Sequence, residues 1–165
     1  MKKFELTTDT KMRFGKKLFR IKALISFGNV RAGDMGGYIE KEGNLSQSGN
    51  AWVSGNAKVF GDAEVSGNAK VSGNAWVYGD AKVSGNAEVS GNADYATASG
   101  FGSEYRTTTF FKLKDSNEIG VRCGCFYGTL KEFRAKVKEK HGESKKAKEY
   151  LMLADLMEYR FLEEK

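Results

Sequence analysis

The sequence is poor in the residues on which many catalytic and metal sites depend. Proline is absent, and the 165 residues include only two cysteines and one histidine. Two thiols and one imidazole cannot supply the four nitrogen or sulfur ligands of a structural zinc site, so we expect neither a metal site nor another cofactor. The histidine, His141, precedes Gly142 at the expected end of a helix, where an imidazolium simply suits the helix dipole.

Long apolar segments are also missing. The longest apolar run, residues 150–154, is far shorter than the roughly 20 residues that span a bilayer. The first residues, MKKFELTTD, contain no apolar core of a secretory signal. We therefore expect a cytoplasmic protein without membrane contact. Cys123 and Cys125 would share one side of a strand, in poor geometry for a disulfide, and we expect two small buried side chains.

The middle of the chain is a six-residue repeat. Residues 51–92 read as seven consecutive copies of A-x-V-x-G-[ND]. Ala and Val are two positions apart and therefore share one face of a short strand, while Gly-Asn or Gly-Asp supplies a sharp corner. Because so short a strand cannot bury its inner face alone, it must stack on copies of itself.

Three repeats make one expected coil. Residues 51–68 match the following chain at 11 positions after a shift of 6, at 12 after a shift of 12 and at 14 after a shift of 18. The longest shift also aligns Phe60 with Tyr78 and Asp62 with Asp80. The 18-residue period predicts a mainly β protein whose centre is a short triangular parallel β-helix.

Three regions are expected along the chain: a β cap at 1–36, the repeat solenoid at 37–98 and an α+β tail at 99–165. Weak alternation on both sides of Gly15-Lys16 predicts a hairpin in the cap. Lys41 and Gln47 occupy valine positions at the start of the repeat register, and Tyr95 occupies one at its end. Polar or bulky residues suit the open ends of a solenoid, where stacking stops.

The tail is expected to contain a hairpin and two helices. Strands at 106–114 and 119–127 precede Thr129 and Glu132, a capping box that opens a helix ending at Gly142. A second helix should run from Ser144 to about residue 162. It is apolar on more than one side and needs two partners. The residues expected in tail packing or oligomer contacts are Tyr150, Leu151, Leu153, Met157 and Phe161.

The outer positions of the coils predict a binding surface. Phe60, Trp76 and Tyr78 should form an apolar patch on one face, with Lys58 over the Trp76 ring. Three alternatives stay open for what covers this apolar patch. They are the chain's own tail or a second copy of the chain, a foreign partner, and a small ligand in a groove between solenoid and tail. The candidate binding residues are Trp52, Lys58, Phe60, Asp62, Trp76, Tyr78 and Asp80.

The two aspartates of this set should lie one above the other at a corner of the solenoid. Carboxylates that close repel, so either one pKa is raised or a cation lies between them. With only two oxygen-bearing side chains in place, we expect a solvated corner and no metal site.

Segments on both sides of the repeat carry a family resemblance. They read LFRIKAL at 18–24, FGNVRAGDMGGYIE at 27–40, NLS at 44–46 and GCFYGTLKEF at 124–133. With the repeats, the first three resemble the YdcK-like β-solenoid group of hexapeptide-repeat proteins. The fourth is similar to the tail of solenoid proteins often found in phages and prophages. The resemblance implies a left-handed β-helix and self-association as a trimer or dimer, and it transfers no catalytic residue.

Non-enzymatic binding is the function that these observations favour. Many left-handed β-helix proteins are acyltransferases with a histidine as general base, but residues 37–98 contain no histidine. A nucleic-acid-binding accessory protein is the other alternative, because residues 1–22 carry eight Lys and Arg against two acids. The resemblance to phage proteins suggests an inhibitor or sequestering factor against a bacterial defence system. Its partner would be a host protein or a small ligand.

Overall fold

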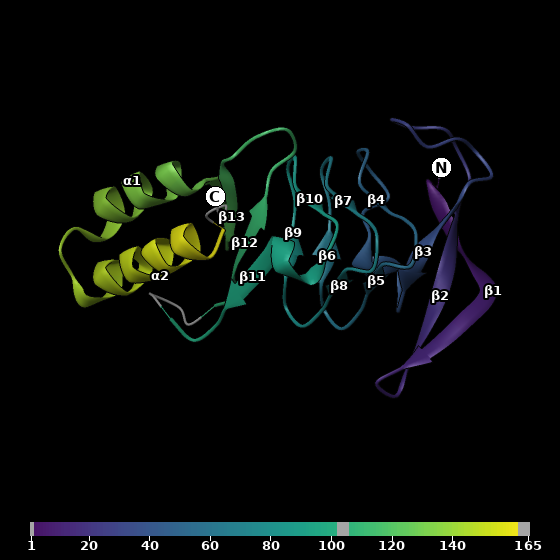
Figure 1. Cartoon of the computed structure of the whole chain (residues 1–165), viewed down its shortest axis with the longest axis horizontal. Helices are drawn as coiled ribbons and strands as arrows, with labels where there is room; N and C mark the ends of the chain where they lie inside the picture. The colour runs from purple at the N-terminus through teal and green to yellow at the C-terminus, as the bar shows by residue number, and fades with distance from the viewer. Residues whose placement is uncertain (1, 102–105, 162–165) are drawn as a thin grey trace. The chain divides into compact units, whose positions relative to one another are not determined.

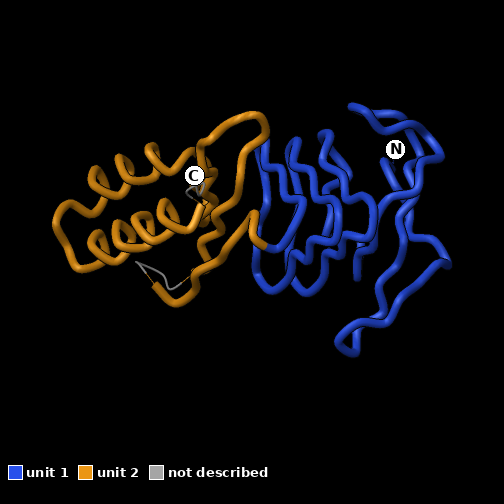
Figure 2. Tube along the Cα trace, in the orientation of Figure 1, with its two compact units in different colours: residues 1–92 blue, residues 93–165 orange. Residues whose placement is uncertain are grey.

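The computed structural model describes residues 2–101 and 106–161 (Figure 1). The fold is mainly β, with two helices in the C-terminal part. The chain divides into two compact units, Met1–Asn92 and Ala93–Lys165 (Figure 2). The boundary therefore falls earlier than the predicted end of the solenoid at residue 98, because Tyr95–Ala98 pairs with a strand of the second unit.

Unit 1 begins with an antiparallel hairpin. Strand β1 (Phe4–Arg13) pairs with β2 (Lys16–Ala23), which confirms the predicted hairpin in the cap. The turn lies at Phe14 and Gly15, one residue earlier than expected, and both residues have positive φ, 53° and 74°. Two such residues in succession are typical of the tight turns that match the twist of paired strands. Strand β3 (Met35–Ile39) pairs antiparallel with the other side of β2.

The repeats form short strands in three parallel ladders. The ladders are β4–β7–β10, β3–β5–β8 and β6–β9, so each repeat enters the next ladder and every third repeat returns to the same one. Trp52 pairs with Lys70, and Lys70 pairs with Glu88, which confirms the 18-residue period. Figure 1 shows the strands as successive layers. Their bounds are β4 Trp52–Val53, β5 Lys58–Val59, β6 Glu64–Val65, β7 Lys70–Val71, β8 Trp76–Val77, β9 Lys82–Val83 and β10 Glu88–Val89.

The inner rows of alanine and valine form the core between these ladders. Every Ala and Val at the two inner positions of the repeats, from Ala51 to Val89, is at most 1% exposed. Burial of one valine side chain contributes about 1.5–3 kcal/mol. The small side chains make each coil's core thin, so stability depends on the stacking of successive coils.

The backbone hydrogen bonds of the parallel ladders all run in one direction between successive coils. N–H groups donate to carbonyls of the following coil, as from Trp52 N to Ala69 O at 3.1 Å. In the ladder β4–β7–β10, β4 is the first strand among residues 2–101 and 106–161, so the carbonyls at and just before β4 have no preceding strand of that ladder to pair with. The ammonium of Lys3, which is 1% exposed, donates to Ala51 O at 2.7 Å and to Gly49 O at 3.5 Å. A buried cation thus caps this edge.

Two asparagines cap other parts of the ladders. Asn44, in the short 3-10 helix η1 (Glu42–Asn44), donates to Gly61 O at 3.1 Å and to Ala63 O at 2.8 Å. At the other end of the repeats, Asn92 Oδ1 accepts a hydrogen bond from Trp76 N at 2.7 Å. Asn92 opens the second 3-10 helix, η2 (Asn92–Asp94). Side chains at the ends of the repeats therefore supply partners that a further strand would otherwise supply.

The register of the first coil differs from the prediction. Ile39 pairs with Val59, and Leu45 forms a bridge with Val65, so these partners are 20 residues apart instead of 18. The predictions that Lys41 and Gln47 occupy valine positions are therefore wrong. The two extra residues fall between Ser46 and Asn50, whose N–H groups donate to Val65 O and Gly67 O. Gln47 Oε1 instead accepts hydrogen bonds from the N–H groups of Lys3 and Phe4.

A pair of corner glycines offers a matched test of coil stacking. Gly67 and Gly79 both have positive φ, 64° and 69°. A Cβ at Gly67 would lie 2.9 Å from Gly85 N of the next coil, whereas a Cβ at Gly79 would meet nothing within 4 Å. We expect Gly79→Ala to cost about 1–2 kcal/mol through its backbone conformation alone. Gly67→Ala should lower the free energy of unfolding by at least about 1 kcal/mol more, because the new Cβ would push the backbone of the next coil away at Gly85. Urea unfolding measures both, and equal losses would contradict this stacking.

Unit 2 contains a four-stranded antiparallel sheet and two helices. The sheet order is β11 (Tyr95–Ala98), β12 (Thr108–Lys112), β13 (Ile119–Cys123) and β14 (Phe126–Thr129). The prediction that Tyr95 ends the solenoid register is wrong, since Tyr95 begins β11 and pairs with Phe111. The predicted hairpin strand at 119–127 is two strands, β13 and β14, joined by a tight turn.

That turn separates the two cysteines. Cys123 ends β13, Gly124 has a φ of 57°, and Cys125 lies in the turn. Cys123 is half-buried and Cys125 is exposed, and neither forms a disulfide. The prediction of two buried side chains on one side of a strand is therefore wrong, because glycine reverses the chain between them.

The helices follow the predicted pattern. Helix α1 (Leu130–His141) opens with the capping box of Thr129 and Glu132, and α2 spans Lys145–Phe161. Tyr150 and Met157 are buried in the core of unit 2, and three half-buried residues pack against that core: Leu151, Leu153 and Phe161. Within the described residues, neither helix is long and apolar enough to cross a membrane.

Candidate functional site

A cluster of aromatic rings lies beside the ladder β3–β5–β8 in unit 1. Phe60 and Tyr78 stack with ring centroids 5.4 Å apart and an interplanar angle of 10°, as the 18-residue period predicts. Phe14, from the hairpin turn, lies 5.9 Å from Phe60 and meets Trp76 edge-on at 5.1 Å. Phe60 is buried, Trp76 is half-buried, and Phe14 and Tyr78 are 65% and 52% exposed. The cluster therefore presents two rings to solvent over a packed base.

The hairpin turn covers part of the predicted apolar patch. Leu18 of β2 packs in one cluster with Tyr38 and Phe60, and Trp76 packs against that cluster. The N-terminal hairpin is not among the covers expected from the sequence. Phe14 beside Gly15 is the sequence feature that could have predicted this contact, because a large exposed apolar residue at a hairpin tip indicates an interaction with another surface. The part of the patch that remains open is Tyr78 together with the outer side of Phe14.

Three cations surround the ring of Tyr38. The Lys11 ammonium lies 4.6 Å from the ring centroid, the Lys58 ammonium 5.9 Å and the Arg20 guanidinium carbon 6.0 Å. Lys58 pairs with Tyr38 on one side and with Trp76 on the other. The predicted neighbours Lys58 and Trp76 therefore lie side by side in the ladder, and the shifted register of the first coil also brings the Lys58 ammonium over the ring of Tyr38.

Not all of these cations have an acidic partner. Arg20 pairs with Asp9 at 3.5 Å, and neighbouring Lys16 pairs with Glu40 at 3.4 Å. Within residues 2–101 and 106–161, no carboxylate forms an ion pair with the other three cations of this region: Lys11, Arg13 and Lys58. Such a group of unbalanced charges attracts anions.

Lys58 shows the electrostatic cost of this arrangement. Its side chain is buried, and its ammonium donates to Asn56 O at 2.8 Å. Burial lowers the pKa of Lys58, and the positive charges of Lys11 and Arg13 lower it further. An anion bound here would relieve that repulsion.

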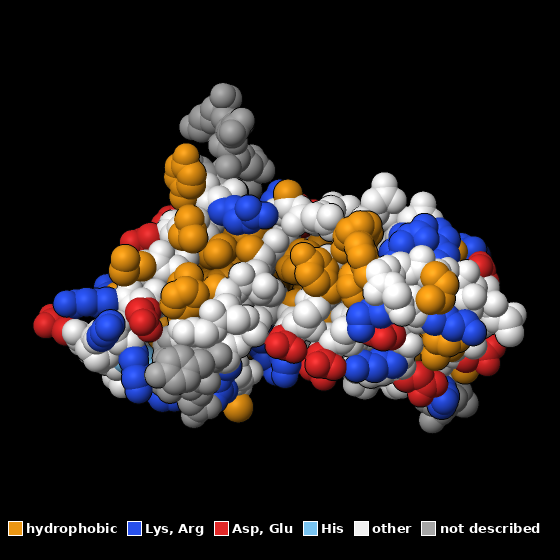
Figure 3. All heavy atoms as spheres, turned by 90° about the horizontal axis from the view of Figure 1, so that it is seen from below, with side chains coloured by type: hydrophobic (Ala, Val, Ile, Leu, Met, Phe, Trp, Pro, Cys, Tyr) orange, Lys and Arg blue, Asp and Glu red, His pale blue; other side chains and the backbone are white. Residues whose placement is uncertain are grey.

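We call this surface the aromatic–basic face. In Figure 3, Lys and Arg side chains lie next to hydrophobic side chains over the part of unit 1 that carries β1 and β2 in Figure 1. The residues of the face are Lys11, Arg13, Phe14, Tyr38, Lys58, Phe60, Trp76 and Tyr78. Four of them, Lys58, Phe60, Trp76 and Tyr78, are candidate residues from the sequence. Lys11 and Arg13 were noted there only as part of a basic flank.

Trp52 is not brought to this face. It belongs to the ladder β4–β7–β10, is 6% exposed and meets the ring of Phe27 edge-on at 5.4 Å. The loop between β2 and β3 thus covers this residue, and a ligand could reach its ring only after that loop moved.

The corner at Asp62 and Asp80 contains a cation of the protein itself. Lys41 Nζ lies 3.0 Å from Asp62 Oδ1. Their hydrogen bond lowers the pKa of Asp62 and raises the pKa of Lys41. Across the described part of the chain, no group of three or more His, Cys, Asp or Glu side chains is placed to hold a metal ion. The cation beside Asp62 is therefore a lysine of the chain itself.

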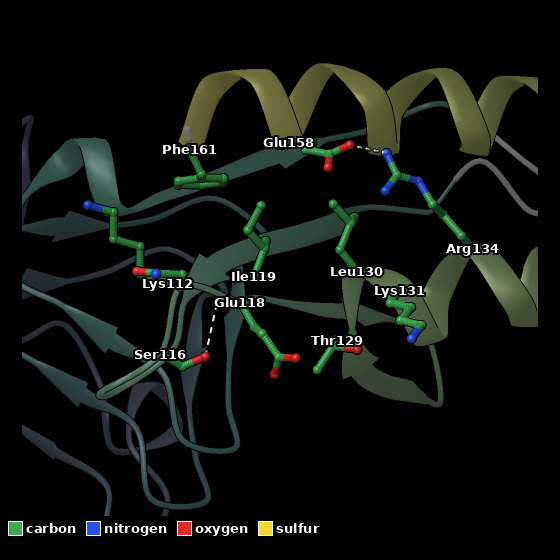
Figure 4. Close-up of a pocket in the computed structure, with 11 residues that line it drawn as sticks. Lys112, Ser116, Glu118, Ile119, Thr129, Leu130, Lys131, Arg134, Glu158 and Phe161 are labelled. Atoms are coloured by element: carbon green, nitrogen blue, oxygen red, sulfur yellow. Dashed lines mark hydrogen bonds and ion pairs between the residues drawn. The ribbon is translucent and has the colours of Figure 1, made fainter. Parts of the chain in front are cut away.

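Unit 2 contains a cavity of about 470 Å³ (Figure 4). Its apolar lining includes Ile119, Leu130 and Phe161, and its rim carries both signs of charge. Two rim cations are already paired: Arg134 with Glu158 at 2.7 Å and with Asp155 at 2.8 Å, and Lys112 with Asp94 at 3.3 Å. Because these rim charges are largely balanced, the cavity favours neither an anionic nor a cationic ligand. The aromatic–basic face is the stronger candidate site.

Comparison with known proteins adds no family to these observations. No protein-family model and no curated protein matches the chain. The YdcK-like resemblance, and what it implies for handedness and self-association, stays a prediction.

Proposed function

We propose that this chain is a non-enzymatic binding protein that holds an acidic protein surface on its aromatic–basic face. One observation carries the proposal: Lys11, Arg13 and Lys58 have no carboxylate partner in the described chain, and Lys11 and Lys58 lie over the ring of Tyr38, which packs in the aromatic cluster with two exposed rings. Carboxylates of a partner would supply the missing counter-charges. The exposed rings of Phe14 and Tyr78 would supply apolar contact area.

The composition of the face fits a protein interface. Aromatic residues and arginine are enriched at the centres of such interfaces, where a few anchors carry most of the binding energy. Complementary charges add specificity and accelerate association. Since Lys58 and Trp76 lie on paired strands of one ladder, these anchors lose little conformational freedom on binding.

We also propose that the three ladders are the walls of a left-handed triangular β-helix. Successive repeats enter the three ladders in turn, and all inner alanines and valines are buried. Left-handedness rests on the resemblance described above. Stacked ladders of this kind would keep the aromatic–basic face rigid while a partner binds.

The proposal includes no catalytic step. His141 lies at the end of α1 against the ring of Tyr150, with ring centroids 5.8 Å apart. An acyltransferase remains the enzymatic alternative. The resemblance to phage proteins makes an inhibitor of a bacterial defence system the specific form of the prediction, with a protein of the host cytoplasm as its target.

Charge reversal on the hairpin tests the proposal. The probe is a fluorescein-labelled peptide of glutamates with two tryptophans, and binding is measured by anisotropy. We expect Lys11→Glu with Arg13→Glu to weaken binding at least about tenfold, because two attractive contacts become repulsive. Tyr78→Ala should weaken it about threefold to tenfold and preserve the fold, because its ring is half exposed.

The matched control reverses two charges on α1. Lys138 and Lys140 are exposed and form no ion pair in the described chain, so Lys138→Glu with Lys140→Glu changes the net charge equally. This control should bind the peptide like the wild type. Equal losses in both variants would show attraction by net charge alone and refute the site. Tighter binding of labelled single-stranded oligothymidine than of the peptide would favour the nucleic-acid alternative instead.

A further inference from the structure

A stripe of large apolar side chains on α2 is exposed and has no cover among the described residues of unit 2. Met152, Leu156 and Tyr159 are 69%, 55% and 76% exposed. They recur at intervals of four and three residues and therefore form one stripe along the helix. The opposite side of α2, with Tyr150 and Met157, is buried in the core of unit 2. An exposed apolar stripe of this kind marks an interaction surface.

We propose that this stripe is a self-association surface on which α2 of a second copy packs antiparallel. In that arrangement Met152 would lie opposite Leu156 of the second copy. Lys148 would lie opposite Tyr159, and Glu149 opposite Arg160. The two members of each pair lie almost symmetrically about position 154, so one register serves all three pairs. A twofold axis would form each pair twice, as a closed dimer requires.

The three pairs are chemically complementary. Met152 and Leu156 make an apolar centre, and the Lys148 ammonium can lie over the Tyr159 ring as a cation–π pair. Glu149 and Arg160 carry opposite charges. Successive helical residues are 100° apart, so Lys148 and Tyr159 lie on one side of the stripe and Glu149 and Arg160 on the other. Antiparallel packing brings like sides together and also opposes the two helix dipoles.

The contact between two such helices is small. Interfaces below the standard size belong to weak or transient complexes, so we expect a dissociation constant in the range of about 10–100 µM. This self-association does not depend on the binding function proposed for unit 1. The two proposals can therefore fail separately.

Sedimentation velocity between about 5 and 500 µM tests the proposal. The wild type should shift from monomer to dimer in that range. Leu156→Glu places a carboxylate in the apolar centre and should weaken dimerisation at least about tenfold. Met12→Glu is the matched control, because Met12 is 59% exposed and lies on β1, outside the helix that forms the proposed contact. Circular dichroism checks that both variants keep their helix content.

A charge exchange tests the antiparallel register. Glu149→Arg would place arginines opposite each other and should weaken the dimer at least about tenfold. Adding Arg160→Glu should restore wild-type association, because the pair then has opposite charges again. A wild type that stays monomeric at about 500 µM overturns the proposal. So does a Leu156→Glu variant that dimerises like the wild type, or an exchanged double variant as weak as Glu149→Arg alone.

Discussion

Asn44→Ala is expected to lower the free energy of unfolding of unit 1 by about 3–4 kcal/mol. Asn44 is completely buried, and both ends of its amide are bound. Its oxygen accepts from the N–H groups of Glu40 and Lys41 at 3.1 and 2.9 Å. Its nitrogen donates to Gly61 O and Ala63 O of the neighbouring coil. Alanine would leave buried backbone groups without partners, which costs more than the loss of a solvated hydrogen bond.

Asn68→Ala is the matched control for this prediction. Asn68 is an exposed asparagine at a repeat corner, and its amide donates only to Asn86 Oδ1 at 3.4 Å. We expect it to cost less than about 0.5 kcal/mol in the same urea titration. A loss of similar size in the two variants would mean that Asn44 does not cap the carbonyls of Gly61 and Ala63.

Raising the pH from about 8 to 10.5 is expected to stabilise unit 1 through Lys3. Burial lowers the pKa of Lys3 from 10.5 to about 8. Between these values the unfolded chain holds the proton and the folded chain does not, so the free energy of unfolding rises with pH. The gain approaches about 3 kcal/mol when both values have been passed. The neutral amine can still donate a hydrogen bond to Ala51 O, so the cap persists at high pH.

Lys3→Met isolates this effect. Methionine keeps an apolar stem beside Phe27, over whose ring the Lys3 ammonium lies at 4.8 Å, but it cannot titrate. The pKa of Lys58 is also lowered, and its contribution is common to both proteins. From pH 7.5 to 10.5, the wild type should therefore gain about 2–3 kcal/mol relative to the variant. A stability difference that stays constant with pH would contradict the lowered pKa.

The repeat was the part of the fold most open to prediction. Phe60 and Tyr78 stack as the 18-residue period requires, because identical short strands can only pair with copies at the same position in the coil. The capping box of Thr129 and Glu132 is local as well, and α1 begins where it predicts. Signals that repeat, or that act over a few residues, are contained in the sequence.

The predictions were wrong where the sequence repeat continued but the strand register changed. Glycines recur before residue 51 in the same rhythm, yet Ile39 and Leu45 take the inner positions expected for Lys41 and Gln47. The choice depended on which residues pair with Val59 and Val65 and on the buried amide of Asn44. In unit 2, Gly124 turned one expected strand into two.

By itself, the sequence determined the coil period, the alanine and valine core and the second helix of the tail. Only the tertiary structure decided which residues form the aromatic–basic face. Phe14 reaches Trp76, and Lys11 reaches Tyr38, through the packing of a hairpin onto a ladder far away in sequence. Contacts of that kind depend on the register between elements, and a register offset of two residues changes which side chains meet.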